Sequence, residues 1–147
     1  MTDTLLQNLS GYATAVAAIV AATQLWFVRE QARTQFEDQI SAQYRAIIRE
    51  LPVEALLSGE LDRESQLAAL PAFFHYFDLC NEQAFLWKRK RIRRKTWKEW
   101  EEGIVQNFKR PAFHQAWCAV SPRVAESFDE LRATLAKAEV YAESLTR

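Results

Sequence analysis

Residues 5–28 read LLQNLSGYATAVAAIVAATQLWFV, a stretch without an ionised side chain that Arg29 follows directly. At the helical rise of about 1.5 Å per residue, this stretch is long enough to cross the roughly 30 Å hydrocarbon core of a bilayer. Its length and composition predict a single membrane-spanning helix over residues 5–28. The rest of the chain is then a domain attached to this anchor.

The alanine-rich centre of this segment leaves an alternative open, because such a helix can also be the buried central helix of a soluble bundle. Aromatic residues at both ends favour the membrane, since rings of this kind settle at the level of the lipid headgroups. These residues are Tyr12, Trp26 and Phe27. A cleaved signal peptide fits less well, because no lysine or arginine precedes the apolar run.

Charges on either side of the span predict its orientation. Asp3 is the only charged side chain before it, whereas several arginines follow it, namely Arg29, Arg33, Arg45 and Arg49. Because loops rich in lysine and arginine stay on the cytoplasmic side, we expect a single-pass protein of the inner membrane with its N-terminus outside and its C-terminal domain in the cytoplasm.

The sequence after the anchor predicts an all-α fold. The chain has only three glycines and four prolines in 147 residues, and no stretch alternates apolar and polar residues over the length of a strand. Apolar residues at helical spacing extend the span into a stalk helix over 29–51, and a linker around Ser58 and Gly59 precedes a helical bundle over 61–145. The expected cytoplasmic domain is therefore 29–147, too short for two domains.

Two helix starts follow from local capping rules. Thr96 and Glu99 have the spacing of a capping box, which predicts a short helix that runs to about Phe108. Ser121 and Pro122 match an N-cap and a first helical residue, which predicts the start of the last helix.

Cysteines and histidines give no sign of a metal site or a cofactor. Cys80 and Cys118 are far apart in apolar helical patterns and neither belongs to a CxxC motif, so we expect two free core thiols. His75 and His114 are isolated from other metal-ligating residues, and we expect no metal, no cofactor and no enzymatic activity.

The most unusual local composition is a basic turn, residues 88–95, with the sequence KRKRIRRK. Three tryptophans flank this turn, and the basic residues are Lys88, Arg89, Lys90, Arg91, Arg93, Arg94 and Lys95. Such a cluster can bind anionic lipid headgroups or the phosphates of RNA, with tryptophans available for base stacking. A third interpretation is a solvated turn that pairs with acids such as Glu101 and Glu102 of a neighbouring subunit.

Small residues on one face of the anchor predict self-association, because they let helix backbones approach closely. They are Gly11, Ala15, Ala18 and Ala22. A second, polar stripe consists of Gln7, Ser10 and Thr14, which a ring of helices could turn toward a water-filled pore. A simpler interpretation is that the hydroxyl groups bond back to their own helix.

The order of these elements resembles that of small bacterial membrane-anchored domains of unknown function. The shared features are the span, a Phe-rich helix over Phe73–Trp87, the basic turn, and the segments Trp97–Trp100, Phe113–Trp117 and Phe128–Leu131. Some proteins of this layout resemble the membrane accessory protein of type VI-B CRISPR systems. That resemblance implies a ring-shaped membrane pore with a degenerate HEPN-like site at Arg110 and His114, which stand closer together than in active HEPN ribonucleases.

Two classes of function follow from this reasoning. The first is a homo-oligomeric, membrane-anchored effector that forms a pore in bacterial antiviral defence, where the defence role comes only from the resemblance. The second is a non-enzymatic anchored scaffold that holds RNA or a cytoplasmic protein partner through the basic turn. Conductance across liposomes would distinguish the two, because a scaffold should give none.

Overall fold

The structure is a computed structural model that describes residues 2–124 and 126–138, with side chains described from residue 12 onward. The described residues form helices and contain no strand, which confirms the all-α prediction. They belong to two compact units, residues 1–36 and residues 37–147. Helix α1 (Thr2–Glu50) contributes to both units, and residues 139–145 of the expected bundle lie outside the described range.

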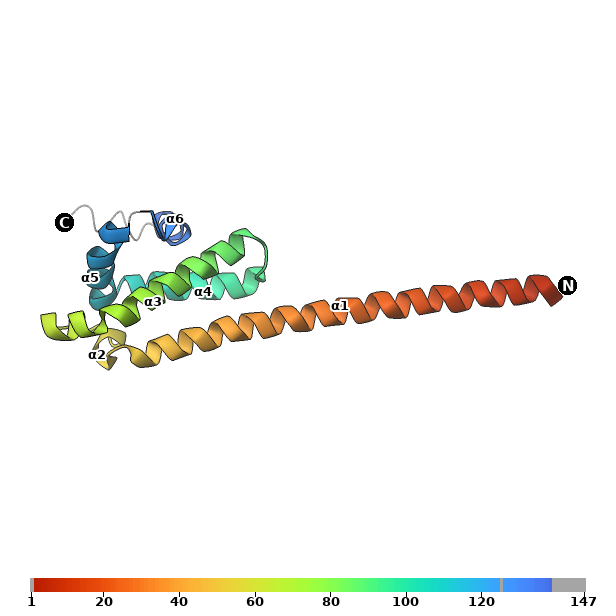
Figure 1. The fold of residues 1–147 in the computed structure, drawn as a ribbon, viewed down its shortest axis with the longest axis horizontal. Coiled ribbons are helices and arrows are strands. Elements are labelled where there is room, and N and C mark those ends of the chain that lie inside the picture. Colours follow the sequence, from red (N-terminus) through yellow and green to blue (C-terminus); the bar gives the residue numbers. More distant parts are fainter. Residues whose placement is uncertain (1, 125, 139–147) are drawn as a thin grey trace. The chain divides into compact units, whose positions relative to one another are not determined.

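The first unit consists of the N-terminal part of α1 (Figure 1). Every side chain from Tyr12 to Arg29 is exposed, including the large apolar ones of Ile19 and Leu25. The polar hydroxyl of Thr23 is satisfied within the helix, because it donates to the carbonyl oxygens of residues 19 and 20 at 2.6 and 3.0 Å. This part of α1 is the one described helix that is long and apolar enough to cross a membrane.

The second unit begins within α1 and contains all the remaining helices. They are α2 (Val53–Leu56), α3 (Arg63–Lys88), α4 (Arg94–Phe108), α5 (Pro111–Val120), the 3-10 helix η1 (Ser121–Val124) and α6 (Asp129–Lys137). Helix α3 is central, because α4, α5 and α6 all pack against it. The C-terminal part of α1 belongs to the same unit and places Ile40 in a buried position, and Leu51, which directly follows α1, is also buried.

Helix α3 begins where local chemistry favours it. Asp62 is the N-cap, and its carboxylate accepts a hydrogen bond of 2.7 Å from the backbone N–H of Ser65. This hydrogen bond stabilises the ionised form and lowers the pKa of Asp62. Pro71 lies inside the helix with its ring exposed, and the chain continues as one helix to Lys88.

The predictions of two helix starts from local caps were wrong. Helix α4 begins at Arg94, two residues before the expected capping box, and the hydroxyl of Thr96 donates instead to Glu37. Helix α6 begins at Asp129, whereas Ser121 and its neighbours form η1. Phe128, the residue before α6, has a left-handed φ of 65° and a side chain that is only 4% exposed.

The backbone N–H groups at the start of α6 are bound by a side chain from another helix. The amide oxygen of Asn81 on α3 accepts from the N–H groups of Glu130 and Leu131, each at 3.1 Å. Burial of the Phe128 ring against Trp117 helps to hold a backbone conformation that a bulky residue rarely adopts. Contacts between helices, rather than a local cap, therefore define this start.

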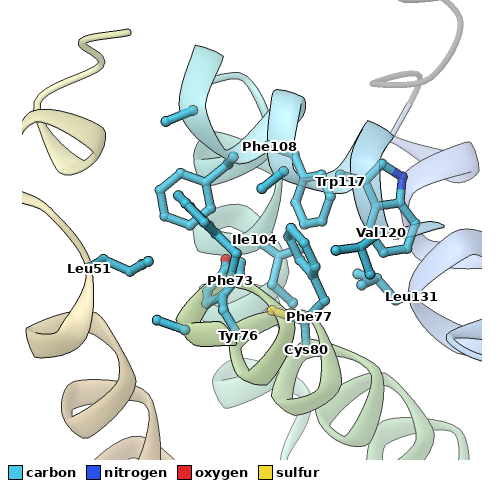
Figure 2. Packing of buried hydrophobic residues seen from close by; sticks show 14 of the residues in the cluster. Leu51, Phe73, Tyr76, Phe77, Cys80, Ile104, Phe108, Trp117, Val120 and Leu131 are labelled. Carbon is cyan, nitrogen blue, oxygen red and sulfur yellow. The ribbon is translucent and has the colours of Figure 1, made fainter. Parts of the chain in front are cut away.

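The core of the second unit is rich in aromatic side chains, as Figure 2 shows. Phe73 and Tyr76 both meet Phe113 edge to face at 5.1 Å, and Phe77 meets Trp117 in the same way at 5.0 Å. The buried hydroxyl of Tyr76 accepts a hydrogen bond of 2.8 Å from the side-chain amide of Asn107. Burial raises the pKa of Tyr76 well above its usual value, so this phenol stays neutral.

The two cysteines differ in their surroundings. Cys80 is buried in the core as expected, and burial raises the pKa of its thiol to about 12. Cys118 is exposed on α5, so the prediction of a second core thiol was wrong. Its sulfur lies 3.9 Å from the ring nitrogens of His114, one helical turn away. No group of three potential metal ligands occurs among the described residues.

Candidate functional site

The basic turn connects α3 to α4. Arg89 is the C-cap of α3, and Lys90 takes a left-handed φ of 57° that reverses the chain. The single apolar residue of the turn, Ile92, is 2% exposed and ties the turn to the core. Its neighbours on both sides are charged and face outward, except for the half-buried Arg93.

A buried carboxylate of α1 holds this turn in place. Glu37 is 7% exposed, and its two oxygens accept hydrogen bonds from the backbone N–H of Arg93 at 2.8 Å and from the guanidinium of Arg93 at 2.9 Å. The hydroxyl of Thr96 donates to the same carboxylate at 3.0 Å. A negative charge at the start of α4 also interacts favourably with the helix dipole. We call this arrangement the Glu37 clamp.

Two tryptophans close the base of the turn. The rings of Trp87, at the end of α3, and Trp97, in the first turns of α4, stack with centroids 5.8 Å apart and planes only 5° from parallel. Trp97 is 5% exposed. Each ring therefore already has a stacking partner, and the face of Trp97 is not open to a nucleic acid base.

Several basic side chains of the turn have partners within the chain, among them Arg89, whose guanidinium lies 5.1 Å from the centroid of the Phe85 ring. Arg93 belongs to the Glu37 clamp, and Lys88 forms a salt bridge of 2.7 Å with Glu130 of α6. The side chain of Lys88 is 68% exposed, so this bridge contributes little to stability. The other five remain on the surface, and they are Arg89, Lys90, Arg91, Arg94 and Lys95.

Two acids of the same chain bind basic residues of the turn. Glu37 and Glu130 take this role, whereas Glu102 forms a long, exposed contact of 3.9 Å with Lys98. Sequence reasoning missed Glu37, although its position carries a signal. A glutamate three residues before the buried Ile40 lies on the buried face of an amphipathic helix, where an ionised group needs a partner.

The small-residue face of the anchor is exposed along its described part. Ala15, Ala18 and Ala22 all lie in the exposed part of α1, so the structure leaves this face open for another helix. The burial of Gly11, Gln7 and Ser10 lies outside what the structure describes. Thr14 is the one described member of the stripe, and it is exposed.

The HEPN-like pair lies at the start of α5. Arg110 is the N-cap residue, and its carbonyl oxygen accepts the backbone N–H of His114 at 3.0 Å as part of the helix. Both side chains are partly buried. The ring nitrogens of His114 lie 3.9 Å from the thiol of Cys118, one turn further along α5.

Comparisons with protein-family models, with curated proteins and with solved structures gave no match for this chain.

Proposed function

We propose that this chain is a single-pass membrane protein that presents a helical domain with its basic turn to the anionic headgroups of the cytoplasmic leaflet. The observation that carries the proposal is the exposure of every described side chain from Tyr12 to Arg29. A soluble protein would leave this large apolar surface in water, whereas a bilayer would cover it. The excess of arginine after the span supports a cytoplasmic domain, and a reporter fused to the C-terminus tests that orientation.

The Glu37 clamp keeps the basic turn near the membrane. Glu37 follows Val28, the end of the apolar span, by nine residues in the sequence. Nine residues reach about 14 Å as a helix and about 32 Å at full extension. Because Arg93 binds Glu37 directly, the turn is tethered within this range of the span. A tether of this length favours contact with headgroups of the same membrane.

The contacts of the turn favour lipid over RNA. RNA without base pairing is bound mainly by stacking on open aromatic faces combined with positive charge. Here Trp87 and Trp97 stack on each other, whereas the side chains of Lys90, Arg94 and Lys95 are exposed and can reach a flat, charged surface. RNA or a cytoplasmic protein partner is the alternative ligand of the same turn, and a scaffold is the alternative function.

Binding to vesicles tests the proposal. The variant replaces Lys90, Arg94 and Lys95 with Gln, because these exposed residues take no part in the Glu37 clamp. A fragment of residues 37–147 should bind vesicles of phosphatidylglycerol, and the triple variant should lose about 3 kcal/mol, at about 1 kcal/mol per basic residue. The affinity should fall more than about 100-fold at low salt, and the difference should shrink as salt rises.

A matched control separates the position of these charges from their number. Replacing Arg63, Lys109 and Arg123 with Gln removes the same amount of charge from three exposed positions outside the basic turn. This control should bind anionic vesicles nearly as the wild type does. Equal losses in both triple variants would leave the net charge, and not the turn, responsible. If the turn variant lost RNA binding and the control variant kept it, the result would favour the scaffold function.

The exposed small-residue face supports a second proposal, that the anchor self-associates and that the oligomer is a pore-forming effector. Ala15, Ala18 and Ala22 would let anchors pack closely, and a ring could turn the polar stripe inward. The antiviral role rests on the resemblance alone. Conductance of liposomes that contain the full chain tests the pore, and the absence of conductance would leave the anchored scaffold.

A further inference from the structure

The second unit contains a cavity that the basic turn and the anchor do not use. Its volume is about 160 Å³, and it lies between the C-terminal part of α1, α3 and α4. An engineered cavity of about 150 Å³ holds one benzene molecule. The cavity therefore has room for a group about as large as one six-membered ring.

The lining of this cavity combines aromatic rings with acceptors and lacks a cation. Tyr44, Tyr76 and Trp100 contribute the rings, and Glu99 contributes a carboxylate. No lysine, arginine or histidine belongs to its described lining. An anionic ligand would find no opposite charge here, whereas a cation would meet aromatic side chains and a carboxylate.

A buried side chain without a partner also faces this space. Gln83 is 4% exposed, and no hydrogen bond to its side-chain amide occurs among the described residues. A buried amide usually has a partner, because leaving one unpaired costs free energy. Because Gln83 lines the cavity, a group bound there can reach its side chain. A bound ligand could supply the missing hydrogen bond.

A glycine inside α4 keeps the cavity open. Gly103 lies in the interior of the helix and lines the cavity, and a Cβ atom added there would meet no atom within 4 Å. Glycine in a helix interior costs about 1 kcal/mol relative to alanine. Gly103 therefore lowers the stability of the helix. It also leaves an empty space beside Glu99 and Trp100, which a side chain at this position would occupy.

From these observations we infer that the cavity is a binding site for a small organic cation, an ammonium group of about one-ring size. The three rings surround the alkyl groups of the cation, Glu99 provides the opposite charge, and Gln83 accepts or donates a hydrogen bond to a polar substituent. The source of the ammonium group is either a free amine or the headgroup of a lipid. This inference is independent of the proposed role of the basic turn.

Calorimetric titration of the full chain in a maltoside detergent, which has no ammonium group, tests the inference. The probe is choline, and its control is dimethylbutanol, in which an uncharged carbon replaces the nitrogen. We expect choline to bind at least about tenfold more tightly, since a desolvated cation over aromatic rings gains about 2 kcal/mol. Equal binding of both compounds, or binding of neither, would overturn the inference.

Variants of two lining residues locate the site. Glu99→Gln should weaken choline binding, whereas Glu101→Gln, on the same helix but outside the cavity lining, should not. Gly103→Leu should fill the cavity and abolish choline binding, while its thermal unfolding stays that of a folded protein, because leucine is a good helix former. Undiminished choline binding by folded Gly103→Leu would overturn the assignment to this cavity.

A second arm distinguishes the two sources of the ammonium group. Choline is titrated into the full chain in vesicles of phosphatidylcholine and, separately, of phosphatidylglycerol. Weaker apparent choline binding in phosphatidylcholine would indicate competition by the lipid headgroup. Equal choline binding in the two vesicles would indicate a site for free amines.

Discussion

Removing the carboxylate of the Glu37 clamp should destabilise the second unit measurably. In Glu37→Ala, the backbone N–H of Arg93 and the hydroxyl of Thr96 lose their acceptor, and the half-buried guanidinium loses its counter-ion. An unpaired buried polar group costs about 1–3 kcal/mol, a lost helix cap costs about 1 kcal/mol, and a partly exposed ion pair adds less than that. These terms overlap, so we expect a loss of about 3 kcal/mol, which lowers the Tm by about 10 °C.

Thermal unfolding in detergent, followed by tryptophan fluorescence, measures this loss, because the stacked pair of Trp87 and Trp97 lies beside the clamp. Asp38→Ala is the matched control, since it removes a neighbouring but exposed carboxylate. Glu37→Gln should fall between the two, because one amide oxygen still accepts a hydrogen bond. Hydrogen exchange should also speed up in the first turn of α4. A Tm for Glu37→Ala equal to that of Asp38→Ala would refute the reasoning.

Three further predictions concern other parts of the chain. Ala15→Leu combined with Ala18→Leu should reduce the mass of the detergent-solubilised particle by light scattering without impairing membrane insertion; an unchanged mass would mean that other contacts hold the assembly. Iodoacetamide at pH 8 should modify Cys118 and spare Cys80, whose pKa of about 12 leaves about one thiol in ten thousand ionised until the protein unfolds; equal rates would contradict the burial of Cys80. Tyr76→Phe should cost about 1–2 kcal/mol in urea unfolding, because its buried asparagine partner is left unpaired, and an unchanged midpoint would argue against that hydrogen bond.

The sequence predicted the helical class and the places where helices break, but it did not predict two helix starts. Local rules look for a cap within a few residues of the start. The polar groups at the starts of α4 and α6 are instead bound by Glu37 and Asn81, which belong to other helices. Such partners lie about fifty residues away in the chain, so no local pattern contains them.

The sequence predicted only part of the candidate site, because contacts between residues distant in the chain define the rest. Composition alone identified the basic turn, because seven basic residues within eight positions are conspicuous in any chain. It could not separate Arg93, which is held by the clamp, from Lys90 or Arg94, which remain at the surface. The cavity was also not predicted, because its lining comes from three helices and its space depends on the missing side chain of Gly103.

Alkaline carbonate extraction of membranes from cells that produce the full chain tests the central claim most directly. Carbonate at high pH removes proteins that are bound to a membrane surface by charge, whereas an apolar helix that spans the bilayer stays with the lipid. We predict that the full chain remains in the membrane pellet and that a chain without residues 1–28 does not. Recovery of the full chain in the soluble fraction would contradict the anchor, and the exposed apolar surface of α1 would then require a protein partner.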